Sequence, residues 1–119
     1  MMSITLEKSR NFAIKIYNLY KYLCDEKREY ILSKQLLRSG TSIGANLAEA
    51  KYAISRKEFK VKAKISLKEC AETEYWLDLL KDVNLLDQHS YNELITDCKE
   101  LLRLLIATAK TLNKETDNN

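Results

Sequence analysis

The chain has 119 residues, of which 31% are charged and 45% hydrophobic, and its formal net charge is +3. This length fits one folded domain with its own core, and the balance of charged and apolar residues excludes an intrinsically disordered chain. With no proline and only two glycines, few residues interrupt a helix, so an all-α fold is predicted. Because no apolar run approaches the ~20 residues that span a bilayer and no signal peptide is evident, we expect a cytoplasmic protein.

A first helix is predicted over about residues 6–25. Its apolar residues recur every three or four positions, as expected for one face of a helix with a period of 3.6 residues. These residues are Phe12, Ile16, Leu19, Tyr20 and Leu23. The polar run "CDEKREY" that follows indicates a connection.

The second predicted helix, about 31–53, contains both glycines of the chain and could also be read as a loop. At about 100° per residue, however, its polar residues fall within an arc of roughly 80° and its apolar residues within a neighbouring arc of about 60°. The polar arc holds Gln35, Arg38, Ser42, Asn46 and Glu49, and the apolar arc holds Leu32, Leu36, Ile43, Leu47, Ala50 and Ile54. A loop has no reason to segregate residues in this way. We therefore predict a helix in which Gly40, Gly44 and Ala48 form a ridge that lets another helix approach closely.

The third predicted helix, about 56–83, begins at a capping box formed by Ser55 and Glu58 and ends before Asn84, a residue that tolerates the left-handed conformation. It carries two apolar stripes on nearly opposite sides. One comprises Phe59, Ala63, Ser66, Cys70 and Leu77, and the other comprises Val61, Ile65, Trp76, Leu79 and Val83. A single bundle buries only one of them, so we predict that the second stripe is the interface of a homo-oligomer. The alternative is a set of scattered surface apolar residues.

The fourth predicted helix, about 88–112, starts at Asp87 as its N-cap. Its apolar seam alternates between steps of three and four residues: Tyr91, Leu94, Cys98, Leu101, Leu105, Thr108 and Leu112. Residues 113–119, "NKETDNN", have little to bury and are predicted to form a frayed polar tail. Four amphipathic helices with short connections predict one domain over 1–112, an antiparallel up-down-up-down four-helix bundle.

Candidate catalytic groups are few. Cys24, Cys70 and Cys98 are widely spaced among apolar residues, so we interpret them as small core residues and not as metal ligands or disulfides. A di-iron bundle needs two Glu-x-x-His pairs, whereas the chain has one histidine, His89. No Gly-Lys-Ser/Thr phosphate loop is present, and His89 lacks a serine–carboxylate context. We predict no enzymatic activity, no metal and no cofactor.

Charge is distributed unevenly along the chain. Residues 51–68 contain seven basic residues and one acidic residue, whereas residues 69–119 contain five basic and eleven acidic residues. A binding surface for the phosphate backbone of RNA or DNA is predicted, in which Lys57 and Lys60 are expected to be exposed. We call it the basic rim, and it comprises Lys51, Arg56, Lys57, Lys60 and Lys64. Aromatic residues are sparse there, so base stacking is not indicated. The alternative is a protein–protein interaction scaffold in which these lysines only form a solvated face.

The polar arc of the second helix also allows two interpretations. Partly buried charges are tolerated when they are paired, so these residues are predicted to form a structural polar network with the third helix. The network would comprise Gln35, Arg38, Asn46, Glu49 and Glu69. The alternative is a ligand-binding groove.

The run from Gln35 to Ala50 resembles the signature of a bacterial four-helix-bundle family that includes proteins encoded within intervening sequences of 23S ribosomal RNA genes. The residues that match its pattern are Gln35, Arg38, Ser42, Ile43, Asn46, Ala48 and Glu49, while Leu47 and Ala50 replace isoleucine and glycine. "SRKEF" and the later Ser66, Leu67 and Glu69 are similar to further family motifs.

The resemblance implies a four-helix bundle that assembles into a ring-like homopentamer, without an established activity. A distant branch contains the accessory proteins of diversity-generating retroelements, which work with a reverse transcriptase and bind nucleic acid through a basic surface. The chain resembles the intervening-sequence branch more closely. We therefore expect a non-catalytic, homo-oligomeric accessory protein, with itself and RNA or DNA as partners.

Overall fold

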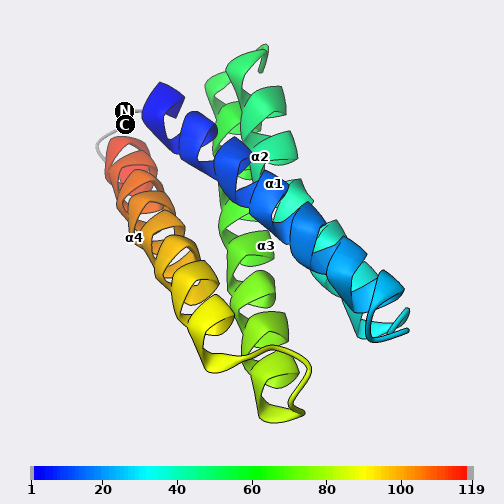
Figure 1. The fold of residues 1–119 in the computed structure, drawn as a ribbon. Helices are drawn as coiled ribbons and strands as arrows, with labels where there is room; N and C mark the ends of the chain where they lie inside the picture. Colours follow the sequence, from blue (N-terminus) through cyan, green and yellow to red (C-terminus); the bar gives the residue numbers. More distant parts are fainter. Residues whose placement is uncertain (1, 118–119) are drawn as a thin grey trace.

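Four α-helices form the computed structural model, which describes residues 2–117. They are α1 (Met2–Asp25), α2 (Leu32–Lys51), α3 (Arg56–Asp82) and α4 (Gln88–Asp117). Successive helices run in opposite directions, and α1 also contacts α4 (Figure 1). The predicted all-α, antiparallel four-helix bundle is confirmed. None of the four helices combines the length and the apolar character needed to cross a membrane.

The helix bounds differ from the predicted ones mainly at the two ends of the chain. Helix α1 begins at Met2, earlier than predicted, and α4 continues through Asp117. Residues 113–117 are thus helical and not a frayed tail, while 118–119 lie outside the described residues. The reason is that the end of α4 has partners: Leu112 is buried, and Glu115 forms an ion pair with Arg56 of α3.

All four helices contribute to one core. Its apolar residues repeat every three or four positions along each helix, so that one side of each helix faces the bundle axis. The side chains that are at most 1% exposed include Phe12, Ile16, Leu23, Leu36, Ile43, Leu47, Leu77, Leu80, Leu101 and Leu105. Burial of this kind contributes roughly 1.5–3 kcal/mol per large side chain, which makes the core the main source of stability.

The two glycines lie inside α2 with negative φ angles, as predicted. Both face α1. A Cβ atom at Gly40 would be 2.8 Å from Ile16 Cγ2, and one at Gly44 would be 2.9 Å from Ser9 Oγ. Real Cβ atoms do not approach other atoms so closely, so the glycines permit a contact between α1 and α2 that alanine would not permit unchanged. The predicted close approach of a second helix is confirmed.

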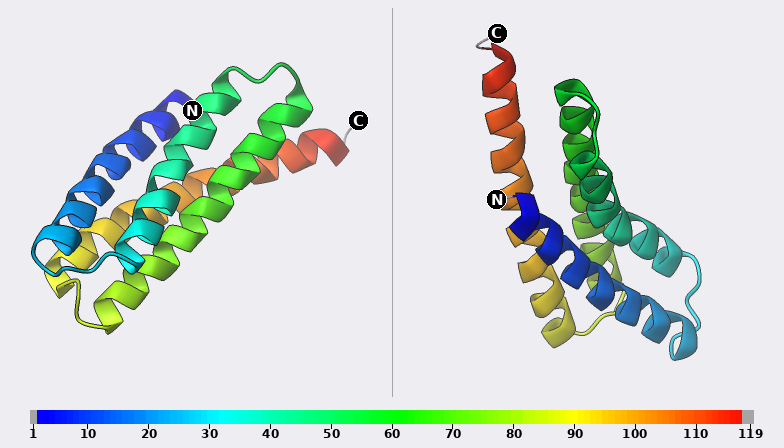
Figure 2. Two further views of the ribbon diagram at one scale, coloured as in Figure 1. Left: turned by 90° about the vertical axis from the view of Figure 1, so that its right-hand side faces the viewer. Right: turned by 90° about the horizontal axis from the view of Figure 1, so that it is seen from above.

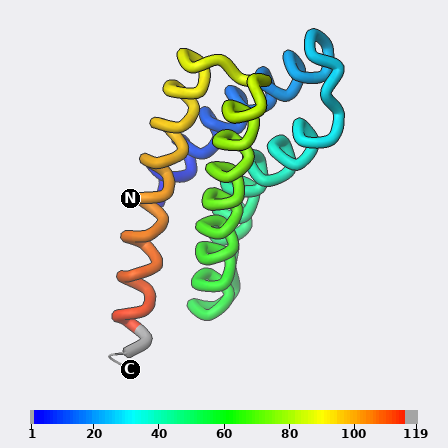
Figure 3. Tube along the Cα trace, turned by 90° about the horizontal axis from the view of Figure 1, so that it is seen from below, coloured from blue at the N-terminus to red at the C-terminus, as the bar shows by residue number. Residues whose placement is uncertain are grey.

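The bundle has two unlike ends (Figure 2). One end holds the connections 26–31 and 83–87, and we call it the capped end. The other holds the connection 52–55, the start of α1 and the end of α4, and we call it the basic end. Figure 3 shows α3 and α4 side by side, joined at the capped end by the connection 83–87.

At the capped end, Glu29 satisfies the start of α2. Its carboxylate accepts hydrogen bonds from the backbone amides of Ile31, Leu32 and Ser33, at 3.2, 3.1 and 2.8 Å. Burial by itself raises the pKa of the Glu29 carboxyl, but the amide hydrogen bonds outweigh it and hold the pKa below its ordinary value. Glu29 therefore acts as the N-terminal cap of α2.

The second connection of the capped end is fixed by its own side chains. Asn84 has φ = 64°, the predicted left-handed residue after α3. Asp87 accepts a hydrogen bond from the amide of Ser90 at 2.8 Å, which confirms it as the cap of α4 and lowers the pKa of its carboxyl. Between them, Leu86 is only 5% exposed and belongs to the core.

At the basic end, Ser55 caps α3 as predicted, with its Oγ accepting from the amide of Glu58 at 3.0 Å. The other half of the capping box is wrong. The Glu58 carboxylate accepts from the amide of Ile54 at 3.3 Å, not from that of Ser55. Ile54 lies between two helices, so this bond satisfies a backbone donor that no helix uses.

Two of the three cysteines are core residues. Cys70 and Cys98 are fully buried, and their sulfur atoms are 3.9 Å apart. A hydrogen bond with Cys70, together with burial, raises the pKa of the Cys98 thiol well above its ordinary value, so it is a poor nucleophile. Cys24 differs from the prediction because it is only half-buried, with its thiol 3.7 Å from Ser33 Oγ.

Candidate nucleic-acid interface

The basic rim follows the last turn of α2 and the first turns of α3 at the basic end. Lys51, Arg56 and Lys57 are exposed, as predicted. Lys60 and Lys64 are half-buried, so the expectation that Lys60 would be exposed is wrong. The helical spacing along α3 did not show that other parts of the chain partly cover these two side chains.

Arg56 is held by the end of α4. Its guanidinium donates to the Glu115 carboxylate at 2.7, 2.9 and 3.1 Å, and it lies 5.2 Å from the centroid of the Phe59 ring. The pair is exposed, so it contributes little to stability, but it offsets the positive charge of Arg56. Sequence reasoning missed Glu115 because it is 59 residues away in a segment predicted to fray.

Three lysines of the rim, in contrast to Arg56, form no ion pair with an acidic side chain among the described residues. Within residues 2–117, no acidic side chain forms an ion pair with Lys51, Lys57 or Lys64. The neighbouring Lys62 lies 3.6 Å from Glu49 and is thus partly neutralised. Positive potential at the basic end therefore comes chiefly from the three lysines without an acidic partner.

Between α2 and α3 the chain exposes apolar side chains beside these lysines. Tyr52 is 77% exposed and Ile54 is 94% exposed. The prediction that Ile54 lies on the apolar face of α2 is wrong, because the helix ends at Lys51. Bonds from the amides of Tyr52 and Ala53 to α2 carbonyls close its last turn.

An open hollow of about 350 Å³ lies beside this connection. Its lining combines apolar side chains with the two cations at its edges: Ala50, Ala53, Ile54, Phe59, Lys51 and Arg56. Sequence analysis found the cations but did not find the hollow, because the hollow depends on where α2 ends and how the chain turns into α3. Two cations of the basic rim, Lys51 and Arg56, therefore share this open hollow with apolar side chains.

The outer stripe of α3 lies on the surface of the chain. Val61 and Val83 are 48% and 47% exposed, whereas Ile65, Trp76 and Leu79 are half-buried. Trp76 packs partly against the core and donates its ring N–H to Glu72 at 2.9 Å. This stripe has the composition of a docking face, and its role as a subunit interface remains a prediction.

The predicted polar network divides into two groups. Arg38 donates to Glu69 at 3.1 Å, to Glu72, and to Gln35 at 3.3 Å, which joins α2 to α3. Glu72 was missing from the sequence prediction, although it lies three residues after Glu69 and thus on the same side of α3.

The remaining two residues of the predicted network lie apart from this group. Asn46 donates to the backbone carbonyl of Ser42 within α2, at 2.8 Å. Glu49 forms an ion pair with Lys62, at 3.6 Å. Within residues 2–117, neither side chain forms a hydrogen bond or an ion pair with Arg38, and of the two only Glu49 joins α2 to α3.

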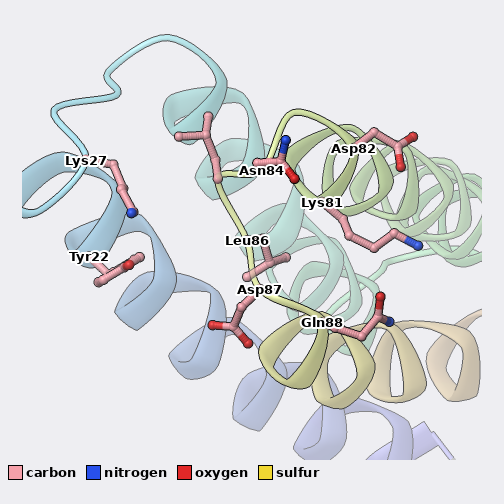
Figure 4. A pocket seen from close by; sticks show the side chains of 9 residues that line it. Tyr22, Lys27, Lys81, Asp82, Asn84, Leu86, Asp87 and Gln88 are labelled. Carbon is pink, nitrogen blue, oxygen red and sulfur yellow. The ribbon is translucent and has the colours of Figure 1, made fainter.

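A larger hollow, of about 490 Å³, lies at the capped end (Figure 4). Its charged lining residues have both signs: Lys27, Lys81, Asp82 and Asp87. Nearby, Tyr91 donates its hydroxyl to Asp78 at 2.5 Å, which raises the pKa of Tyr91 to about 12. Because its charges alternate, this hollow fits a polyanion less well than the basic end does.

The remaining candidates for reactive chemistry are metal-ligand clusters and His89. No three His, Cys, Asp or Glu side chains come together as metal ligands within the part of the chain that the structure describes. His89 is exposed in the first turn of α4. The geometry thus directs attention to binding surfaces.

Comparison with known proteins identifies the family. The family of 23S rRNA-intervening sequence proteins matches residues 3–107. The chain belongs to this family. A crystal structure of a protein with unknown function from the S23 ribosomal protein family of Bacteroides thetaiotaomicron VPI-5482 is 47% identical, with a TM-score of 0.89. The match covers 92% of this chain and 97% of that chain. Among curated proteins, none matches.

Family membership agrees with the resemblance found in the sequence, and the likeness in structure extends over nearly the whole bundle. Neither match names an activity: the solved relative is a protein of unknown function. Function must therefore be argued from the surfaces of this chain.

Proposed function

We propose that this member of the family is a non-catalytic, cytoplasmic accessory protein that binds the backbone of RNA or DNA through its basic rim. The observation that carries the proposal is the set of lysines at the basic end without an acidic partner among the described residues: Lys51, Lys57 and Lys64. Lysines placed in this way neutralise phosphates and release condensed counterions.

The proposal includes a homo-oligomer, the ring-like homopentamer that the family resemblance implies. Support comes from the outer stripe of α3, in which Val61 and Val83 are about half exposed and Trp76 provides a large, half-buried aromatic side chain. A ring would repeat the basic rim five times and concentrate positive potential. Loss of a buried aromatic anchor typically costs about 2 kcal/mol or more, so Trp76→Ala should weaken the assembly by that amount.

A protein–protein scaffold is the second candidate. The pairing of Arg56 with Glu115 favours it, because that contact removes one of the five rim cations from phosphate binding. The exposed apolar side chains of Tyr52 and Ile54 could equally contact another protein. The two candidates differ in one measurable property, since only the first requires binding that weakens with salt.

A salt titration decides between them. Affinity for a random-sequence RNA and for duplex DNA is measured from about 50 to 200 mM salt, and the mass of the protein in solution is determined on the same sample. The rim predicts similar affinity across sequences and a logarithmic slope of about 0.9 per phosphate contact on duplex DNA, or about 0.7 on single strands. Absence of salt-sensitive binding to either probe contradicts the proposal and favours the scaffold. A monomer at micromolar concentration contradicts the oligomer.

A further inference from the structure

The connection 52–55 carries two apolar side chains that do nothing for the core. Tyr52 is the most exposed tyrosine of the chain at 77%, and Ile54 is 94% exposed. The connection 26–31 also exposes Tyr30 and Ile31, at 49% and 76%, but Tyr52 and Ile54 are more exposed, and Ile54 lies with Lys51 and Arg56 in the lining of a hollow. Their position needs an explanation that the fold does not supply.

The Tyr52 ring is more exposed than any other tyrosine ring of the chain. Tyr22 at the capped end has a similar cation contact, with the Lys27 ammonium group 5.9 Å from its ring centroid, but it is only 45% exposed. Tyr17 lies 6.4 Å from Tyr20, and Tyr75 lies 5.0 Å from Trp76, so each of these rings already has an aromatic neighbour. The contact of the Tyr52 ring is the ammonium group of Lys51, 5.8 Å from the ring centroid. A flat aromatic surface with a cation at its edge combines the two features that proteins use to hold single strands.

We infer that the basic end selects single-stranded over double-stranded nucleic acid, with Tyr52 as the surface on which an unpaired base stacks. The inference rests on the proposed function and names its substrate class. The phosphate chain passes over Lys51 and Lys57, which flank the connection, while Ile54 and the apolar hollow contact the neighbouring base. Duplex bases are already stacked on each other, so they cannot offer a face to Tyr52 away from a helix end.

This inference corrects the expectation from sequence that base stacking is not indicated. The sequence argued against stacking because aromatic residues are sparse near the basic rim, but it did not show how exposed Tyr52 and Phe59 are. Phe59 is indeed half-buried, with Arg56 over its ring. Tyr52, in contrast, lies beyond the end of α2 at Lys51 and faces solvent. One exposed ring with the Lys51 ammonium group at its edge is sufficient for a stacking contact per subunit.

The test uses Tyr52→Ala and Tyr52→Phe, with Tyr30→Ala as a matched control. Tyr30 is 49% exposed and belongs to the connection 26–31 at the capped end. Affinity is measured by fluorescence anisotropy at one salt concentration for an unstructured uridine-rich RNA and for a duplex of the same length. Helix content and mass are checked for each variant by circular dichroism and light scattering; both positions are exposed, so the bundle should be unchanged.

The wild type should bind the single strand at least about fivefold more tightly than the duplex. Tyr52→Ala should lose about 5- to 150-fold on the single strand, the range expected for one stacked base, and little on the duplex. Tyr52→Phe should keep the wild-type affinity because it keeps the ring, and Tyr30→Ala should have no effect. The salt slope should be the same in all variants, since no phosphate contact is removed.

Three outcomes overturn the inference. Stacking is rejected if the wild type binds single strand and duplex equally, or if Tyr52→Ala loses the same affinity on both. If binding still weakens with salt in that case, the proposed function stands. Absence of salt-sensitive binding to either probe rejects the proposed function and the inference together. Binding to phosphatidylglycerol vesicles that Tyr52→Ala abolishes, with RNA affinity unchanged, assigns the connection to a lipid surface instead.

Discussion

The two ends of the bundle meet different demands. At the capped end, several side chains of the connections serve the fold, although Ile31 there is 76% exposed. Glu29 and Asp87 cap helices, Asn84 adopts the left-handed conformation, and Leu86 enters the core. At the basic end, the connection between α2 and α3 contributes a serine cap but also exposes Ile54 to solvent.

This difference separates residues that the fold explains from residues that it does not explain. Removal of a cap leaves backbone donors unsatisfied, and removal of a core side chain leaves a cavity. The residues of the capped end that cap helices or enter the core are therefore constrained by stability. Tyr52, Ile54, Lys51 and Lys57 could change with little effect on folding. Side chains that are not needed for stability, and that lie together with positively charged residues, are better candidates for function.

The largest expected effect is a difference in the free energy of unfolding between substitutions of two aliphatic residues, Leu86 in the connection 83–87 and Ile54 in the connection 52–55. Leu86→Ala should lower the free energy of unfolding by about 2 to 4 kcal/mol, because it leaves a cavity in the core. Ile54→Ala should change it by less than about 0.5 kcal/mol, because the side chain is already in water. Urea denaturation of both variants measures the contrast. A similar loss in the two variants would show that Ile54 is packed in solution and that the ends do not differ as described.

A smaller effect is expected at the cap of α2. Glu29→Ala removes the acceptor of three backbone amides and should cost about 1 to 2 kcal/mol at neutral pH. Glu29→Gln, which keeps one acceptor oxygen without the charge, should lose less. Thermal denaturation at pH 7 compares both variants with the wild type.

The same cap predicts a pH dependence. The pKa of Glu29 is lowered in the folded protein, so its contribution is fully present above the ordinary value near 4.5 and is lost as the pH falls through the folded value. The difference in stability between the wild type and Glu29→Ala should therefore be constant between about pH 6 and 8 and shrink below about pH 4.5. A difference that stays constant into acid would mean that the charge of Glu29 does not stabilise the helix.

Much of the fold could be predicted from the sequence because it depends on local patterns. The 3.6-residue period located the core faces, and segregation of polar and apolar arcs placed Gly40 and Gly44 inside a helix. Caps at Ser55 and Asp87 were recognisable because each involves residues three positions apart. Family membership was indicated by the Gln35 to Ala50 run alone.

The site was less predictable because it depends on contacts between distant segments. The bond between Arg56 and Glu115 requires α4 to reach the basic end, and the apolar hollow requires α2 to end at Lys51. A helical wheel assigned Ile54 to the core face of a helix that stops before it. Periodicity shows which face of a helix is apolar, but it does not show where the helix stops.

One measurement tests the central claim, that binding belongs to the basic end. Lys51→Glu with Lys57→Glu reverses two rim lysines, and Lys27→Glu with Lys34→Glu reverses two exposed lysines at or beside the capped end, with the same change in net charge. Affinity of both double variants for an unstructured RNA is compared at about 0.1 M salt, after mass and helix content are shown to match the wild type. The rim variant should lose at least about tenfold, as expected for two phosphate contacts, and the capped-end variant should stay within about twofold of the wild type. Equal losses in the two variants, or no loss in the rim variant, would contradict the claim.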